Sequence, residues 1–256
     1  MKYNELLINL LPVVYLAGDT IMNIYKQSFK TNYKEDGSPV TIADKKAEKI
    51  ILSGLKPLAN GIDIISEENS ESHKLKTKDK FFLVDPLDGT KEFLKKDGKG
   101  SFTVNIALIE NGVPIFGIVY APALERMFSG IIKHGAVEYS KKNKKTISVR
   151  KIPNSGPVAV ASNSHRDSET DVWLREHKIV EIISIGSSLK FCLLATGEAD
   201  VYPRFGPTME WDTAAGDAIL RAAGGTMKNP DGSNFIYGKK GFLNSPFIAF
   251  GKNNIF

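Results

Sequence analysis

Two acidic residues, Asp85 and Asp88, lie three positions apart directly after the apolar run 81–84. That run has the composition of a buried strand, so both carboxylates would leave its end on one short loop. Converging carboxylates repel each other unless a cation lies between them, and Mg²⁺ prefers hard oxygen ligands of this kind. This spacing alone is more typical of a solvated acidic turn or a capped helix, so a metal site is indicated only if other segments contribute further ligands.

The two residues that follow this pair could bind an anion. Gly89 tolerates backbone conformations that other residues resist, and Thr90 is a candidate N-cap for a helix beginning near Lys91. The first turn of a helix offers unpaired backbone N–H groups, which bind phosphate well. The loop therefore combines candidate cation ligands with a candidate phosphate site.

Two further segments place acidic residues at the ends of expected elements. Glu67 and Glu68 follow the predicted strand 62–66, and Asp212 lies at the start of a predicted helix whose small residues 214–216 would allow close packing. Each of these acids alone could be a helix cap or a surface residue. Together with the Asp-x-x-Asp loop they favour a metal site to which all three segments contribute.

These motifs, in this order, match a known family. Glu67-Glu68, DPLDGT at 85–90 and WDTAAGD at 211–217 resemble the inositol monophosphatase superfamily of metal-dependent, lithium-sensitive phosphatases. The resemblance extends to the segment 38–41 followed by Asp44. It implies an α/β fold, a layered αβαβα sandwich with metals between its halves, and a phosphate monoester hydrolase inhibited by Li⁺. We also expect inhibition by Ca²⁺, because it would replace Mg²⁺ with an ion of unsuitable geometry.

The resemblance also implies the metal ligands. Glu67, Asp85 and the backbone carbonyl of Leu87 would hold one Mg²⁺, while Asp85, Asp88 and Asp212 would hold a second. The superfamily allows a third, weaker ion near Glu67. Paired ions about 3.5–4 Å apart can bind both the attacking and the leaving oxygen of a displacement at phosphorus.

The remaining catalytic roles follow from the same resemblance. Thr90 and Glu67, with Asp44, would orient the attacking water and take its proton. The backbone N–H groups of Gly89 and Thr90 would hold phosphate oxygens. The expected substrate contacts are Glu67, Leu87, Asp88, Gly89, Thr90, His165, Ser187, Lys190, Arg204 and Asp212.

A narrower resemblance lies in the second half of the chain. The segments 186–192, 202–208 and 162–166 are similar to the 3'(2'),5'-bisphosphate nucleotidases of the superfamily. Such enzymes, which belong to sulfur metabolism, convert adenosine 3',5'-bisphosphate to AMP and phosphate. Acceptance of 3'-phosphoadenylyl sulfate stays open.

A second phosphate on the substrate needs a cationic contact of its own. Lys190 and Arg204 are the candidates, with His165 and Ser187 near the ribose or base. Arg204 could instead form a structural ion pair, and His165 could cap a loop. Because arginine suits bidentate phosphate binding, Arg204 is slightly favoured as a ligand.

Two alternative functions remain. An inositol or sugar monophosphatase would use the same metal motifs, since these bind the phosphoryl group that all such substrates share. A non-catalytic protein could use the acids for a structural ion, although the complete set of candidate ligands argues against lost activity.

Composition limits the class of protein. The 256 residues carry a net charge of +5, and 42% are hydrophobic, which is typical of a globular protein with a sizeable core. The single cysteine, Cys192, lies in an apolar run, so we expect core packing and a cytoplasmic protein. No basic stretch alternates with aromatic residues, so we expect no nucleic-acid partner.

We also expect no transmembrane segment, because no apolar stretch reaches the length of a membrane span and no signal-peptide pattern is present. Some proteins of the group that the chain resembles associate with the periphery of the inner membrane at its cytoplasmic face. No segment of this sequence is recognisable as such an anchor. The oligomeric state is not readable from the sequence.

Hydrophobic periodicity predicts the elements that position these residues. In the first half the predicted helices are 4–29 and 43–55, the latter capped by Thr41, and the predicted strands are 62–66, 81–84, 102–109, 113–120 and 126–129. In the second half the predicted strands are 158–162, 179–184, 199–202 and 247–250, and the predicted helices are 169–175, 188–195 and 213–223. The dipeptide Asn111-Gly112 predicts a β-hairpin.

These elements divide the chain into an α+β half, 1–145, and an α/β half, 146–256, packed as one compact unit. The boundary is expected in the lysine-rich stretch 141–151. Its lysines, like those of 74–80, are expected in solvated loops.

Overall fold

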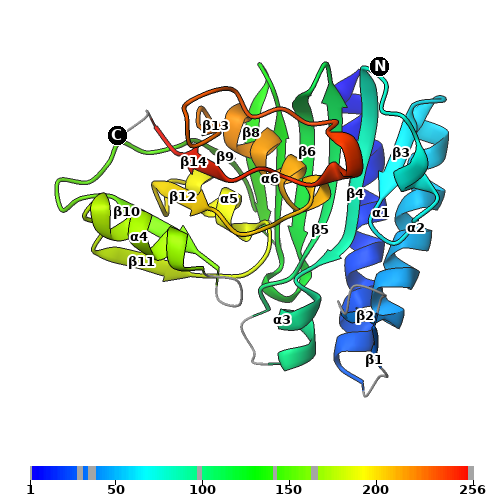
Figure 1. Ribbon diagram of the computed structural model, residues 1–256. Helices are drawn as coiled ribbons and strands as arrows, with labels where there is room; N and C mark the ends of the chain where they lie inside the picture. The colour runs from blue at the N-terminus through cyan, green and yellow to red at the C-terminus, as the bar shows by residue number, and fades with distance from the viewer. Residues whose placement is uncertain are drawn as a thin grey trace.

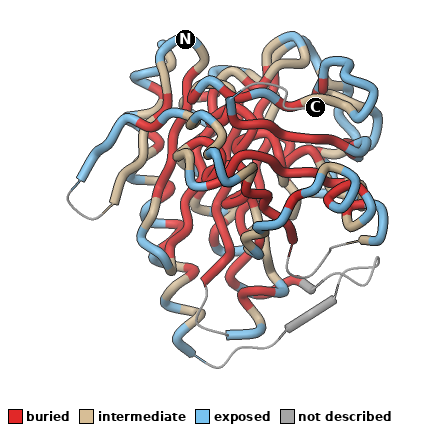
Figure 2. The backbone as a smooth tube through the Cα atoms, turned by 90° about the vertical axis from the view of Figure 1, so that its left-hand side faces the viewer, coloured by how far each residue is buried: buried red, intermediate tan, exposed pale blue. Residues whose placement is uncertain are grey.

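The structure of the chain is a computed structural model that describes residues 2–27, 31–33, 39–96, 100–140, 143–162 and 167–252. Helices and two β-sheets alternate across the molecule in the order helix, sheet, helix, sheet, helix (Figure 1). Three apolar clusters fill the spaces between these layers. Buried chain accordingly runs through the centre, with exposed chain at turns and helix ends (Figure 2). The predicted layered αβαβα sandwich is confirmed.

The larger sheet has seven strands within the described residues, in the spatial order β3-β4-β5-β6-β7-β8-β9. They are β3 (Asp63–Ser66), β4 (Lys80–Asp88), β5 (Thr103–Glu110), β6 (Val113–Ala121), β7 (Arg126–Ile131), β8 (Gly135–Ser140) and β9 (Asn143–Ile147). Only β3 and β4 pair in parallel. Asn111 and Gly112 join β5 to β6 with φ angles of 51° and 74°, which confirms the predicted hairpin.

Two long helices, α1 (Tyr3–Tyr25) and α2 (Ile42–Ala59), cover the outer face of the larger sheet. Their apolar stripes pack against each other and against the sheet. As predicted, Thr41 caps α2, because its hydroxyl accepts a hydrogen bond from the N–H of Ala43. The carboxylate of Asp44 completes a capping box by accepting the N–H of Thr41 at 2.7 Å.

The helix α1 corrects one expectation. Its 23 residues are long and apolar enough to cross a membrane by length and composition, whereas the sequence analysis expects no such stretch. The reason is that residues 6–18 include no charged side chain. Leu10, Val14 and Ile21 of α1 are buried in the cluster shared with α2 and the sheet, as in a helix that packs on a globular core.

The smaller sheet has five strands in the part of the chain that the structure describes, in the order β11-β10-β12-β14-β13. They are β10 (Val158–Ala161), β11 (Glu181–Ser184), β12 (Val201–Arg204), β13 (Thr226–Lys228) and β14 (Phe247–Phe250). The helix α4 (Ser168–Glu176) covers the outer face of this sheet through Trp173 and Leu174.

The helices α5 (Leu189–Ala195) and α6 (Glu210–Ala222) fill the layer between the two sheets. A Cβ atom added to Gly117 of β6 would meet the backbone of Ala215, so α6 approaches the sheet very closely. An added Cβ at Gly216 would similarly meet a ring on α5. The predicted close packing of the small residues of α6 is therefore confirmed.

Among the strands of the two large sheets, β8, β9 and β13 are not predicted from the sequence. Lys144 and Lys145, expected in a solvated loop, lie exposed on β9, at the edge of the larger sheet. Lysines on an edge strand discourage further strand pairing, so a charged run need not be a loop. The strand β9 also runs across the expected boundary at residue 145, and the division into halves stays a prediction.

Short elements connect these layers. They are β1 (Thr31–Tyr33), β2 (Pro39–Thr41), the helix α3 (Thr90–Lys95), and the 3₁₀ turns η1 (Ser72–Lys74), η2 (Pro122–Leu124) and η3 (Lys240–Phe242).

Candidate active site

A pocket of about 370 Å³ opens where β4, α3, β12 and the first turns of α5 and α6 meet. Ten of the predicted site residues line it, although they come from segments far apart in the sequence. These residues are Glu67, Asp85, Leu87, Asp88, Gly89, Thr90, Ser187, Lys190, Arg204 and Asp212. The structure thus brings the three acidic motifs to one place.

The acids at the pocket floor interact electrostatically. Burial raises the pKa of Asp85 well above its ordinary value, and the charges of Glu67, Asp88 and Asp212 raise it further. Burial, followed by the charges of Asp88 and Glu67, likewise raises the pKa of Asp212. Because like charges and burial act in the same direction, these carboxylates would be stabilised by a cation among them.

Backbone N–H groups hold two of these carboxylates. Oδ1 of Asp85 accepts the N–H of Leu87 at 3.0 Å, within the same loop. Oδ2 of Asp88 accepts the N–H of Ser188 at 2.7 Å, which joins the β4 loop to the start of α5. For Asp88, burial raises the pKa and the charge of Lys190 opposes that shift.

Asp212 is held by the start of its own helix. Its Oδ2 accepts the N–H of Met209 at 2.8 Å, and its backbone carbonyl accepts the hydroxyl of Ser188 at 2.6 Å. Ser188 therefore contacts both Asp88 and Asp212, although it comes from a third segment. A serine at this position carries no recognisable catalytic pattern, so the sequence analysis misses this connection.

The donor chemistry of this set fits a divalent cation. It consists of carboxylates and one backbone carbonyl, all hard oxygen ligands, and Mg²⁺ needs few of them because it keeps several waters. Within the described ranges, no three acidic, histidine or cysteine side chains are already arranged to hold a metal ion. Asp85, Asp88 and Asp212 each have one carboxylate oxygen bonded to a backbone N–H.

The prediction that Thr90 caps the following helix is wrong by one residue. The N-cap of α3 is Gly89, whose φ of 90° favours glycine, and Thr90 is the first helical residue. The hydroxyl of Thr90 lies 3.2 Å from Oδ1 of Asp44 and 3.3 Å from the carbonyl oxygen of Leu87. Asp44 thus reaches the site through Thr90, without lining the pocket itself.

Lys190 is one of two buried cations that line the pocket in the described part of the chain. Its side chain donates to the carbonyl of Ser187 at 2.7 Å and lies over the ring of Tyr202. Burial lowers the pKa of Lys190 to about 8, although the nearby charge of Asp88 acts in the opposite direction. Ser187 has a φ of 53°, and its buried Oγ has no hydrogen-bond partner in the described structure.

The guanidinium of Arg204 organises a loop. Nε donates to the carbonyl of Gly206 at 3.0 Å and Nη2 to the carbonyl of Pro207 at 2.9 Å. The N–H of Gly206 in turn donates to Asp167, the N-cap of α4. Arg204 is 7% exposed and lines the pocket, so it shapes one wall in addition to any contact with a substrate.

One predicted contact, His165, lies outside the described residues. Several further residues line the pocket without having been singled out from the sequence as site residues. They are Lys91, Glu92, Ser162, Gly186, Phe191, Tyr202, Pro207, Thr208, Met209, Thr213 and Leu243. Six of these eleven residues come from the segments 162–166, 186–192 and 202–208, so for them the narrower resemblance was the available signal. The catalytic and ligand roles of the predicted residues stay predictions.

Comparison with known proteins agrees with this arrangement. The sequence profile of the inositol monophosphatase family matches residues 3–253. The chain is 45% identical over 239 residues to the 3'(2'),5'-bisphosphate nucleotidase CysQ of Buchnera aphidicola, covering 91% of this chain and 89% of that protein. It is 45% identical to CysQ of Salmonella typhimurium over 235 residues, covering 90% and 94% of the two chains.

A solved structure shares the fold. The crystal structure of CysQ from Bacteroides thetaiotaomicron superimposes with a TM-score of 0.84 at 36% identity, covering 99% of each chain. The similarity therefore includes both sheets and the three helical layers.

Proposed function

The chain belongs to the inositol monophosphatase family, and on this premise we propose that it is a Mg²⁺-dependent 3'(2'),5'-bisphosphate nucleotidase. It would hydrolyse the 3'-phosphate of adenosine 3',5'-bisphosphate to give AMP and phosphate. The observation that carries the proposal is one pocket with buried carboxylates on its floor and Lys190 and Arg204 beside them. The identity of 45% to proteins named for this activity supports the substrate.

Five groups would hold the magnesium ions. They are the carboxylates of Glu67, Asp85, Asp88 and Asp212 and the carbonyl oxygen of Leu87. Bound Mg²⁺ supplies charge neutralisation at the phosphate and lowers the pKa of coordinated water. The raised pKa values of Asp85 and Asp212 support this assignment, because a cation is the simplest partner for such a group of buried acids.

Thr90, Asp44 and Glu67 would handle the proton of the attacking water. The hydroxyl of Thr90 lies within hydrogen-bond distance of Oδ1 of Asp44, and when it donates to that oxygen, a lone pair of Thr90 would accept a hydrogen bond from the water. As the water oxygen bonds to phosphorus and the bond to the 3'-oxygen breaks, the proton of the water would pass to a carboxylate of this group, and the leaving 3'-oxygen would take a proton from solvent to become the 3'-hydroxyl of AMP. The N–H groups of Gly89 and Thr90 would hold the phosphate, without a covalent enzyme intermediate.

The second phosphate of the substrate distinguishes a nucleotidase from a monophosphatase. Lys190 supplies a charge at the pocket wall, and the unpartnered hydroxyl of Ser187 is available to a ribose or phosphate oxygen. The donors of Arg204 that bind the loop carbonyls hold its side chain in place, so Arg204 would act by shaping this wall and by its charge. His165 stays a candidate from the sequence alone.

A phosphate-release assay with Mg²⁺ tests the proposal. We expect adenosine 3',5'-bisphosphate to be hydrolysed with a clearly higher kcat/KM than inositol 1-phosphate or fructose 1,6-bisphosphate. Preference for either of the latter would establish a monophosphatase or sugar phosphatase instead. Asp88→Ala and Asp212→Ala should be inactive while remaining folded by circular dichroism. Full activity in either variant would overturn the metal assignment, and an inactive wild-type protein would favour a non-catalytic role.

A further inference from the structure

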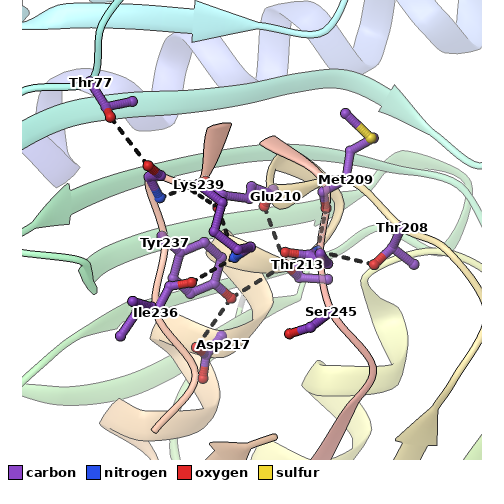
Figure 3. A network of polar contacts seen from close by, with 12 residues as sticks. Thr77, Thr208, Met209, Glu210, Thr213, Asp217, Ile236, Tyr237, Lys239 and Ser245 are labelled. Atoms are coloured by element: carbon purple, nitrogen blue, oxygen red, sulfur yellow. Dashed lines mark hydrogen bonds and ion pairs between the residues drawn. The ribbon is translucent and has the colours of Figure 1, made fainter. Parts of the chain in front are cut away.

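The segment 236–245, here called the strap, crosses the start of α6 and is fastened to it by buried polar groups (Figure 3). We infer that the strap fixes the position of Asp212 through two positioning residues, Glu210 and Asn244. This inference rests on the proposed role of Asp212 as a metal ligand. It assigns a function to buried polar residues that lie outside the catalytic set.

The first attachment point is the carboxylate of Glu210, which is fully buried. Its Oε2 accepts the N–H of Gly238 at 2.8 Å, and its Oε1 accepts the N–H of Lys239 at 3.0 Å. The side-chain ammonium of Lys239 lies 2.8 Å from the same Oε1. A buried carboxylate with two amide donors and one cation is well satisfied, and loss of this charge would leave N–H groups unpaired.

The second attachment point is Asn244, which is 7% exposed. Its Nδ2 donates to the carbonyl of Met209 at 2.7 Å and lies within 3.1 Å of the hydroxyls of Thr208 and Thr213. Its backbone N–H donates to the carbonyl of Thr208 at 2.9 Å. Figure 3 shows Thr208, Met209 and Thr213 converging on this part of the strap.

These two points lie on either side of the group that holds Asp212. The N–H of Met209 donates to Oδ2 of Asp212, while the carbonyl of the same residue is held by Asn244. Glu210 is the next residue and the first of the helix. The orientation of the Asp212 carboxylate therefore depends on a turn whose position the strap determines.

The strap also reaches the pocket and the larger sheet. Leu243 lines the pocket and forms an isolated bridge with Met209. The carbonyl of Gly238 accepts the hydroxyl of Thr77, which precedes β4. Because β4 carries Asp85 and Asp88, the strap connects the strand that supplies two acids with the helix that supplies the third.

The test measures Mg²⁺ binding to the purified full-length protein by calorimetry without substrate, together with the Mg²⁺ dependence of phosphate release. Residues that orient metal ligands typically change metal affinity by about 10–100-fold when mutated. We expect Glu210→Gln to weaken Mg²⁺ binding by about tenfold or more, and Asn244→Ala to act in the same direction. Metal-free melting temperatures report the purely structural cost.

The matched control is Asp200→Asn. Asp200 is also a buried carboxylate that accepts a backbone N–H, from Val158, and pairs with a cation, Arg150. Asp200 does not contact the start of α6, so the Asp200→Asn substitution should lower the melting temperature without changing the Mg²⁺ dissociation constant. If Glu210→Gln is equally destabilised but binds Mg²⁺ like the wild type, the strap is merely structural and the inference fails.

Two further outcomes are informative. If Glu210→Gln does not fold, Lys239→Met replaces it in the test, because this variant keeps both backbone amide hydrogen bonds to Glu210. Weakened Mg²⁺ binding in Lys239→Met and in Asn244→Ala would then support the inference. Unchanged binding in both contradicts it. If the wild-type protein itself binds no Mg²⁺, the proposed function fails at its metal site. If the wild-type protein binds Mg²⁺ and the strap variants bind it equally well, only the inference about the strap fails.

Discussion

The hydroxyl of Thr90 donates a hydrogen bond to Oδ1 of Asp44, 3.2 Å away, and so connects the first turn of α3 to the first turn of α2. Asp44 is 1% exposed, and burial raises its pKa although hydrogen bonds from Thr41 oppose the shift. A buried acid that contacts the pocket through a hydroxyl is suited to orient that hydroxyl and to hold a proton through it.

The first prediction concerns this pair. Thr90→Val keeps the shape of the side chain and removes the hydroxyl, so kcat should fall by about 100-fold or more, the usual size of a lost proton-transfer contribution. Thr90→Ser restores the hydroxyl and should restore most of kcat. Steady-state kinetics at saturating Mg²⁺ measure both variants. A Thr90→Val enzyme with wild-type kcat would remove Thr90 from the reaction.

The second prediction concerns metal removal. Chelation with EDTA should abolish phosphate release, and added Mg²⁺ should restore it and raise the melting temperature. A ligand that binds only the folded state at 100 times its dissociation constant stabilises that state by about 2.7 kcal/mol. Scanning calorimetry across a Mg²⁺ series measures the effect. An EDTA-treated enzyme that stays active would contradict the proposed metal dependence.

The dependence of this metal effect on pH has a definite sign. Burial and neighbouring acids raise the folded-state pKa values of Asp85 and Asp212 above the ordinary value of 3.8. In the metal-free protein their contribution to stability is therefore greatest below that ordinary value, and it is lost as pH rises through the raised pKa values. The gain in melting temperature on adding Mg²⁺ should accordingly be larger at alkaline than at mildly acidic pH.

The third prediction concerns the second phosphate of the substrate. Replacing Lys190 with methionine should raise KM for adenosine 3',5'-bisphosphate by about 10–100-fold, the range expected for a lost charge-assisted hydrogen bond. KM for adenosine 3'-monophosphate, which lacks the 5'-phosphate, should change little. Equal effects on both substrates would place Lys190 at the reacting phosphate instead.

The wild-type pH profile provides an independent check of Lys190. Because burial lowers the pKa of Lys190 to about 8, its charge is present below that pH and is lost above it. KM for the bisphosphate should therefore rise as pH increases through this value, and Lys190→Met should lack that rise. KM measured at fixed free Mg²⁺ gives the comparison.

The fourth prediction concerns the loop that Arg204 shapes. Asp167 accepts the N–H of Thr170 at 2.8 Å and the N–H of Gly206 at 2.9 Å, so it caps α4 and holds the loop. Asp167→Ala should cost about 1 kcal/mol as a lost helix cap. Urea unfolding measures this loss of stability. As the control, Asp231→Ala removes an exposed turn contact and should change the free energy of unfolding little.

The pH dependence of this contribution also follows. Burial alone would raise the pKa of Asp167, but the hydrogen bonds from Thr170 and Gly206 lower it. The stabilisation by Asp167 is therefore present above the ordinary pKa of an aspartate and is lost as pH falls through the lowered value. The difference in stability between wild type and Asp167→Ala should vanish in strong acid.

Local signals in the sequence predicted much of the fold. Thr41 before an amphipathic run, and Asn111-Gly112 between two β-rich runs, act over a few residues, so their outcomes are visible without tertiary structure. The N-cap of α3 was misassigned because both Gly89 and Thr90 are acceptable at that position, and the backbone conformation of the packed loop decides between them. β9 was missed because its lysines are exposed on an edge strand, where apolar alternation is weak.

The sequence by itself determined which side chains could do the chemistry, since the acid spacings at 85–88, 67–68 and 212 are fixed by covalent order and by short-range strand and helix signals. Only the tertiary structure decided that these acids share one pocket with Lys190, that Ser188 contacts both Asp88 and Asp212, and that the strap holds the first turn of α6. The physical reason is that such contacts join residues that lie up to a hundred or more positions apart in the sequence. Their geometry is set by layer packing and burial, which no local pattern encodes.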